Sequence, residues 1–292
     1  MTRTTGQAPR VDPTPESRRA GRVSVTVVIP ARDEADRLPG CLASLARQTI
    51  PPLEVVVVDN GSRDDTAAIA ARAGARVVPE PVPGVWSAAA TGYDTARGDL
   101  IARCDADSVL PRDWLERIVR AFELDPDLQV ISGPGDFYGL WPPLGRSASW
   151  LYMRSYVAAM TLALAHPPVF GSNLAMRNEA WRRARDSVHR THDDVHDDAD
   201  LSYHLAGRMR FDWSLRVGIS PQPLSIGRRR RWRAGMRTVL LHWPAQTPWR
   251  RAWGWSGPRL TTARRTAEQR RGRPRPPDRR ADRSQDRAAG PG

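Results

Sequence analysis

Two acidic residues near the middle of the sequence stand in a pattern that suits metal binding. Asp105 and Asp107 are separated by one residue and lie at the end of the apolar run 100–104. Mg²⁺ and Mn²⁺ prefer oxygen ligands and readily take phosphate oxygens from a substrate as further ligands. The pattern therefore predicts that Asp105 and Asp107 hold a divalent cation that meets a phosphorylated ligand. Taken alone, a solvated turn is the alternative interpretation.

Polar residues also follow two earlier apolar runs. Pro30, Asp33 and Glu34 come after the first run, and Asp59 and Ser62 come after the second. Acids that converge at one edge of a sheet repel one another unless a cation or a basic ligand lies among them. We therefore expect these residues to form a ligand-binding edge together with the metal pair. For Asp59 and Ser62 the alternative is a turn and helix cap, which both residue types also favour.

The runs that carry these residues alternate with helical stretches. Buried strands are predicted at residues 23–29, 53–58, 75–78, 100–104 and 128–132, and helices at residues 35–48, 64–73, 86–97 and 112–124. This alternation indicates βαβ units with right-handed crossovers. The predicted fold class is α/β and Rossmann-like, with a mostly parallel central sheet flanked by helices. Ligands bind such sheets outside the carboxyl ends of the strands.

Composition narrows the class of protein. The chain of 292 residues is long enough for one large α/β domain. Cys41 and Cys104 are the only cysteines, which excludes a disulfide framework and a four-cysteine zinc module. The net charge is +13 and all 45 basic residues are arginine, but the excess lies at the two ends, and residues 23–227 hold more acids than arginines. Nucleic-acid-binding proteins place arginines on the folded reading surface, so no specific nucleic-acid partner is expected.

Composition also divides the chain into four predicted parts. They are a disordered N-terminal arm at 1–22, the α/β domain at 23–227, a basic aromatic extension at 228–258 and a disordered Arg/Pro-rich tail at 259–292. The tryptophans and arginines of the extension suit a bilayer interface, which predicts peripheral attachment to an anionic membrane. An ordinary C-terminal helix that packs on the sheet is an equal alternative. The uncharged stretch 155–176 is interrupted by His, Pro, Gly and Asn and does not read as a membrane span.

Six short motifs occur in a fixed order along the chain. They are VVIPARDE at 27–34, VVVDNGS at 56–62, ARGD at 96–99, DAD at 105–107, FGSNLAMR at 170–177 and DDADL at 197–201. This ordered set resembles family 2 glycosyltransferases over about residues 23–235. The resemblance implies a GT-A nucleotide-diphospho-sugar transferase fold, a divalent metal (Mn²⁺ or Mg²⁺), and inversion at the anomeric carbon by single displacement.

The resemblance also implies roles for individual residues. Asp105 corresponds to a residue near the ribose and the metal, Asp107 to the direct metal ligand, and Asp198 to the general base that takes a proton from an acceptor hydroxyl. Arg231 and Trp232 are similar to part of a signature of processive members. The positions expected to contact substrate are Pro30, Asp33, Glu34, Asp59, Ser62, Asp105, Asn173, Arg231 and Trp232.

Some positions depart from the family pattern. Ala89 and Ala90 stand where the family often has Arg-Asn, so a basic contact to the nucleotide is missing or supplied elsewhere. Asn60 stands where an Asp is usual, and Asp197 where a Glu is usual. For Asp198 the alternative is an acid that stabilises the start of the helix after it, and its acidic neighbours compete for the base role.

Histidines gather shortly before this last acidic stretch. His189, His192 and His196 with nearby acids could form a metal cluster, and His192 and His196 would share one helical face. The glutamate of the zinc-protease helix motif is absent, and a polar loop near an acceptor pocket explains the composition as well. We therefore expect no dedicated zinc site from the sequence.

Together these patterns predict a metal-dependent, inverting, non-processive glycosyltransferase. It would use a nucleotide-diphospho-sugar donor and a hydroxyl acceptor, with a lipid-linked or cell-envelope glycan intermediate as the hypothesis for the acceptor. The expected location is the cytoplasm, with peripheral attachment to the inner membrane face as the hypothesis for the extension. Two other classes stay open: a degenerate homologue that binds nucleotide sugars without turnover, and an Arg-rich nucleic-acid-binding protein.

Overall fold

The computed structural model describes residues 23–139, 142–192, 194–221, 228–243 and 246–249, and for 142–146 and 228–232 the backbone only. The first elements are β1 (Val25–Ala31), α1 (Leu38–Ala46), β2 (Glu54–Asp59), α2 (Thr66–Arg72), β3 (Arg76–Pro79), α3 (Val85–Thr95), β4 (Leu100–Arg103), α4 (Trp114–Leu124) and β5 (Leu128–Ser132). This order confirms the strands and helices predicted for this part of the chain. The expectations for the N-terminal arm and the Arg/Pro-rich tail concern residues outside the described ranges.

The remaining elements include strands that hydrophobic periodicity did not predict. They are β6 (Gly135–Phe137), α5 (Pro142–Leu164), β7 (Leu174–Arg177), α6 (Asn178–Ala184), α7 (Asp197–His204), β8 (Arg208–Phe211), β9 (Val217–Ile219) and α9 (Arg228–His242). The main sheet has seven strands in the order β3-β2-β1-β4-β7-β5-β8. Only β7 runs antiparallel to its neighbours, β4 and β5. The predicted mostly parallel sheet is confirmed.

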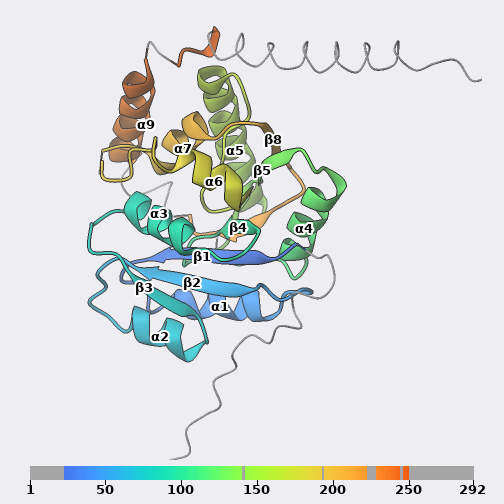
Figure 1. Ribbon diagram of the computed structural model, residues 1–292, viewed down its shortest axis with the longest axis vertical. Helices are drawn as coiled ribbons and strands as arrows, with labels where there is room; N and C mark the ends of the chain where they lie inside the picture. Colours follow the sequence, from blue (N-terminus) through green and yellow to red (C-terminus); the bar gives the residue numbers. More distant parts are fainter. Residues whose placement is uncertain (1–22, 140–141, 193, 222–227, 244–245, 250–292) are drawn as a thin grey trace, which may run out of the picture. The chain divides into compact units, whose positions relative to one another are not determined.

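Helices cover both faces of this sheet. Buried apolar residues of α1, α2 and α4 form one core with Val27 and Ile29 of β1, whereas those of α3, α6 and α7 form a second core with Val28. Figure 1 shows α1 and α2 on one side of β1 and β2 and α3 on the other. Trp114 and Trp181 are fully buried, one in each core. Since β1 is buried along its whole length, it reads as a continuous apolar run.

Strand register determines which loops meet at the edge of the sheet. Ala31 at the end of β1 lies opposite Asp59 at the end of β2. Arg103, the last residue of β4, lies opposite Leu174, the first residue of β7. Because β7 is antiparallel to β4, the residues just before β7 lie at the carboxyl edge of β4. The segments after β1, β2 and β4 and before β7 therefore share one edge.

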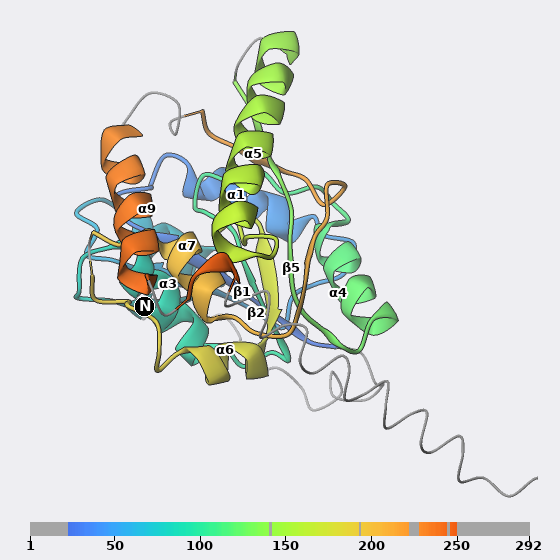
Figure 2. The same ribbon diagram turned by 90° about the horizontal axis from the view of Figure 1, so that it is seen from above.

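Helix α9 lies beside α7, as both ribbon views show (Figures 1 and 2). The Thr238 hydroxyl of α9 accepts a hydrogen bond of 2.9 Å from the backbone N–H of His196, directly before α7. Residues as far as Pro248 belong to the same compact unit as the sheet. Within the described part of the chain, no helix has both the length and the apolar character needed to cross a membrane.

Candidate active site

The loops after β1 and β2 hold each other in place. The Asp33 backbone N–H donates a hydrogen bond of 3.1 Å to the Ser62 hydroxyl, and the Asp33 carboxylate accepts one of 2.7 Å from the Arg63 N–H. Asp59 accepts a bond of 3.1 Å from the Ser62 N–H. Asp33 has a left-handed backbone (φ 54°), which Asp tolerates better than most residues. The structure thus brings Asp33, Asp59 and Ser62 together, with the Asp33 side chain exposed and the other two half-buried.

Glu34 and Pro30 have different surroundings. Glu34 forms an ion pair of 3.1 Å with Arg37, and its negative charge helps to raise the pKa of Asp107. It therefore connects the loop after β1 with the acidic loop after β4. Pro30 is buried within β1 opposite Val58 of β2, where it packs in the sheet. This position differs from the expectation that Pro30 contacts substrate.

The acidic loop after β4 carries the predicted metal ligands. Burial, and then the nearby negative charges of Asp105 and Glu34, together raise the pKa of Asp107 to about 6. The Tyr138 hydroxyl supports the loop by donating a bond of 2.8 Å to the Asp107 carbonyl oxygen. Repulsion among these carboxylates is what a bound cation would relieve. Asp105 and Asp107 therefore fit the oxygen-only ligand set that Mn²⁺ and Mg²⁺ prefer.

Arg103 connects this loop with the start of α7, which is more than ninety residues away along the chain. Its guanidinium is almost fully buried and lies 2.8 Å from Asp197, 3.4 Å from Asp105 and 3.9 Å from Asp198. Burial alone would lower the pKa of Arg103, but Tyr93 and the three carboxylates outweigh burial and raise it well above its usual value. The arginine is therefore fully charged, and it holds the predicted metal loop and the predicted base in one cluster.

Asp197 and Asp198 are adjacent, but their pKa values shift in opposite directions. Burial would raise the pKa of Asp197, yet the charge and hydrogen bond of Arg103 lower it overall, with help from His196. Burial, and then the negative charge of Asp197, raise the pKa of Asp198 to about 7. The buried Asp198 Oδ1 atom has no hydrogen-bond partner among the described residues. A carboxyl that titrates near neutral pH with a free oxygen is suited to accept a proton from a substrate.

The segment before β7 fits closely around these acids. The Ser172 hydroxyl donates a bond of 2.5 Å to Asp105. A Cβ atom on Gly171 would lie 2.2 Å from Asp198 Oδ1 and 2.9 Å from the Arg103 Cζ atom, far inside van der Waals contact. Only glycine at position 171 leaves room for the Arg103–Asp198 approach. The FGSN motif thus shapes the acidic cluster through Gly171 and Ser172.

Asn173 of the same motif lies elsewhere. Its side chain is fully buried, accepts a bond of 2.9 Å from the Trp114 indole, and donates to the carbonyls of Pro134 and Leu215. These internal bonds occupy both N–H groups of its amide, so Asn173 joins α4 to two loops and is not placed to bind substrate, contrary to the expectation. Arg231 and Trp232 lie in α9, and their side chains are outside the described set.

The positions that depart from the family pattern can now be placed. Ala89 and Ala90 are fully buried in the core beneath α3, so neither position faces a ligand. Arg103 supplies a buried positive charge at the acidic edge, and sequence reasoning overlooked it. The available signal was an arginine inside a run predicted to be a fully buried strand, because a buried charge requires charged partners.

Comparison with known proteins identifies the family. Residues 26–183 match the family described as Glycosyl transferase family 2, which is more than half of the chain, and the chain belongs to this family. The uncharacterized glycosyltransferase Rv0539 of Mycobacterium tuberculosis is 40% identical over 110 residues, which cover 38% of this chain and 48% of that protein. The chain thus matches about half the length of this curated relative.

Solved structures support the fold. Glucosyl-3-phosphoglycerate synthase from Mycobacterium tuberculosis, solved with Mn²⁺, uridine-diphosphate and phosphoglyceric acid, has a TM-score of 0.55 at 21% identity, and the match covers 77% of this chain and 80% of that one. Mannosyltransferase PcManGT from Pyrobaculum calidifontis, solved with GDP-Man and Mn²⁺, has a TM-score of 0.52 at 24% identity and covers 68% and 57%. The fold is GT-A, as the sequence resemblance implied.

Proposed function

We propose that the protein is an inverting glycosyltransferase that moves a sugar from a nucleotide-diphospho-sugar to a hydroxyl acceptor. The observation that carries this proposal is the position of Arg103, whose guanidinium contacts both Asp105 and the Asp197–Asp198 pair. Donor activation and proton removal must occur on either side of one anomeric carbon. The buried Arg103 guanidinium contacts Asp105 on one side and the Asp197–Asp198 pair on the other. It therefore holds the proposed metal loop and the proposed base at the short separation that this reaction requires.

Asp107 and Asp105 are the residues that would hold Mn²⁺ or Mg²⁺. Their fit rests on the oxygen-only donor set and on the raised pKa of Asp107, which is caused first by burial and then by the negative charges of Asp105 and Glu34. A bound divalent cation would neutralise the charge that develops on the departing diphosphate. The Mn²⁺ complexes of the two structural relatives support this choice of cofactor. Asp33, Asp59 and Ser62 lie on the neighbouring loops and are the proposed contacts to the nucleoside.

Asp198 is the proposed general base. Its carboxylate takes the proton from the acceptor hydroxyl as the acceptor oxygen bonds to the anomeric carbon and the bond from that carbon to the diphosphate oxygen breaks. General bases of this kind typically contribute about 10²–10⁴-fold in rate. Asp197 neutralises Arg103, which leaves the Asp198 Oδ1 atom for the substrate. No protein nucleophile is needed, because a single displacement inverts the anomeric carbon.

We further propose a lipid-linked or cell-envelope acceptor at the inner membrane face. Large apolar side chains are exposed on two helices, and this exposure supports the proposal. They are Trp150, Leu151 and Leu162 of α5, and Met236, Leu240 and Leu241 of α9 with Trp243 directly after it. Such residues suit a bilayer interface. Flotation with anionic liposomes at physiological salt tests this part, and a protein that stays at the bottom of the gradient rejects it.

A donor panel tests the reaction itself. Thermal shifts with UDP-, GDP- and dTDP-sugars, with and without Mn²⁺, would identify the donor, because a ligand that binds only the folded state raises its melting temperature. Incubation with that donor should then release the nucleoside diphosphate. Asp107→Asn should remove the Mn²⁺-dependent shift, and Asp113→Asn, at a half-exposed position paired with Arg117, should keep it. A donor that binds wild type without any hydrolysis or transfer would favour the degenerate homologue instead.

A further inference from the structure

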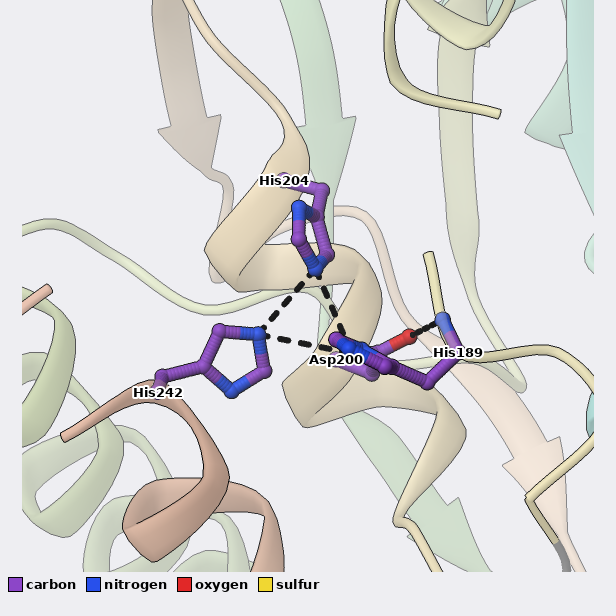
Figure 3. A group of neighbouring side chains, drawn as sticks. All are labelled: His189, Asp200, His204 and His242. Carbon is purple, nitrogen blue, oxygen red and sulfur yellow. Dashed lines mark hydrogen bonds and ion pairs between the residues drawn. The ribbon is translucent and has the colours of Figure 1, made fainter. Parts of the chain in front are cut away.

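A second polar cluster lies between α7 and α9, and the mechanism proposed above does not use it. It consists of His189 from the loop after α6, Asp200 and His204 from α7, and His242 from α9 (Figure 3). Asp200 is fully buried, and the His204 and His242 side chains are only 11% and 3% exposed. Three histidines and one carboxylate from three segments of the chain thus converge in one cluster.

The distances within this cluster match those of a tetrahedral metal site. The Nε2 atoms of His204 and His242 are 3.1 Å apart, and each lies 3.5 Å from Asp200 Oδ1. Ligand atoms about 2.0–2.1 Å from a tetrahedral Zn²⁺ are about 3.3 Å from one another. The fourth atom, His189 Nδ1, lies 2.8 Å from Asp200 Oδ1, and all four atoms are within 4.8 Å of one another. His189 belongs to a loop and is 30% exposed, so its ring has room to adjust.

Surrounding hydrogen bonds orient the ligand atoms toward the centre. His242 Nδ1 donates a hydrogen bond of 2.7 Å to the backbone carbonyl of Thr238. The ring proton is therefore on Nδ1, and the Nε2 lone pair faces the cluster. The ring of Tyr203 stacks on His242 with centroids 4.1 Å apart. Metal-bound histidines almost always donate a hydrogen bond from the second ring nitrogen, as His242 Nδ1 does to the Thr238 carbonyl.

Asp200 is oriented in the same way. Its Oδ2 atom accepts bonds from the Trp86 indole (2.9 Å) and from the His189 backbone N–H (2.7 Å). The other oxygen, Oδ1, is the one that faces the three imidazoles. The carboxylate therefore presents one fixed oxygen to the cluster, as a metal ligand with an outer partner does.

We propose that His189 Nδ1, Asp200 Oδ1, His204 Nε2 and His242 Nε2 bind one Zn²⁺ in a structural site separate from the active site. Imidazole ligands select zinc over Mg²⁺, whereas Asp105 and Asp107 offer oxygen only. Four protein ligands leave no open position for catalysis. The ion would join α9 and the His189 loop to α7, whose first turn carries Asp197 and Asp198. The sequence had grouped His189 with His192 and His196, but His196 instead lies beside Asp197, at 3.6 Å.

Metal content of untagged protein tests this proposal. After chelator treatment, reloading with ZnCl₂ and gel filtration, elemental analysis should find about one zinc per wild-type chain, and stripping the metal should lower the melting temperature by about 5 °C or more. His204→Gln should weaken zinc binding by at least ~100-fold. Co²⁺ in place of zinc should give the intense visible bands of four-coordinate cobalt.

Three variants make the test selective. His189→Gln removes the ligand nearest the surface and keeps the test valid if His204→Gln does not fold. His192→Gln changes a neighbouring histidine outside the cluster, and Asp107→Asn changes the proposed active-site metal ligand; both should bind zinc like wild type. The proposal is overturned if wild type retains no more zinc than His189→Gln, which would leave a hydrogen-bonded network only. It also fails if Asp107→Asn rather than the histidine variants abolishes zinc binding.

Discussion

The two halves of the candidate active site are held together by different interactions. The loops after β1 and β2 use local turn bonds, in which Asp33, Asp59 and Ser62 accept from nearby backbone N–H groups at the surface. The Arg103 cluster instead gathers charges from β4 and α7 beneath the surface. Water can replace a lost bond in the first region but not in the second. Equal changes in the two regions should therefore have very different costs.

Buried polar atoms without hydrogen-bond partners distinguish the second region from the first. Arg103 Nε and Asp198 Oδ1 both lack a hydrogen-bond partner among the described residues. An unpaired buried atom is costly and is seldom retained without a role. Here Asp198 Oδ1 is the atom proposed to take the acceptor proton. The unpaired Asp198 oxygen therefore lowers the stability of the folded state, and it is the oxygen proposed to act as the base.

The largest effect is expected from Arg103→Met. Removing the guanidinium leaves the buried Asp197 carboxylate without its partner and takes the positive charge away from Asp105 and Asp198, which should lower the free energy of unfolding by about 3–5 kcal/mol. Such a loss approaches the total stability of many domains. Urea denaturation followed by circular dichroism measures it. The control is a surface ion pair, in which Arg117 contacts Asp113 at 2.6 Å and both side chains are more than 40% exposed. Arg117→Met should therefore lower the free energy of unfolding by less than about 1 kcal/mol. Equal losses for the two variants would contradict the contrast between the regions.

The same contrast explains what the sequence could and could not predict. Asp33, Asp59 and Asp105 follow strands whose apolar runs are visible in the sequence, so their meeting at one edge follows from βαβ topology. Arg103 meets Asp197 only because β7 inserts between β4 and β5, and no periodicity reveals strand order. His242 reaches His204 through the position of α9, which is equally invisible. The motif predicts a substrate contact for Asn173, but the structure buries its side chain among internal hydrogen bonds, because a motif shows which residues occur together and not which way each side chain points.

A second, more selective effect is expected from Asp198→Asn. Transfer should fall by about 10²–10⁴-fold, because the amide cannot accept the acceptor proton. In wild type, kcat/KM should rise as pH increases through about 7, where the Asp198 carboxyl loses its proton, and the variant should show no such rise. Initial rates between pH 5 and 9 measure this. Asp194→Asn is the control, since Asp194 is 42% exposed and pairs with Arg237 at the surface. A variant with wild-type rates would move the base role to another acid.

Asp198→Asn should lower activity, as argued above, but it should raise the free energy of unfolding at high pH. The folded state raises the pKa of Asp198 from 3.8 to about 7, so it binds the proton more tightly than the unfolded state does. The contribution of Asp198 to the free energy of unfolding therefore falls as pH rises from about 4 to 7 and stays lower above that range. At pH 8 Asp198→Asn should be more stable than wild type, on the order of 1–3 kcal/mol, and near pH 4 the two should agree. Melting curves at the two pH values decide this.

The smallest effect is expected from Ser62→Ala in the first region. The change removes the acceptor of the Asp33 N–H bond, but that N–H lies at the surface, where water can take the place of the hydroxyl. The free energy of unfolding should fall by only about 0.5–1 kcal/mol. Because Asp59 receives its bond from the backbone N–H of residue 62, its turn survives the change. Loss of the proposed Ser62 hydroxyl contact, one neutral hydrogen bond at the surface, should raise the donor KM by no more than about 5-fold. A much larger rise in KM at unchanged stability would show that the hydroxyl contributes more to nucleoside binding than one surface hydrogen bond does. The first region would then depend on its side chains as strongly as the Arg103 cluster does.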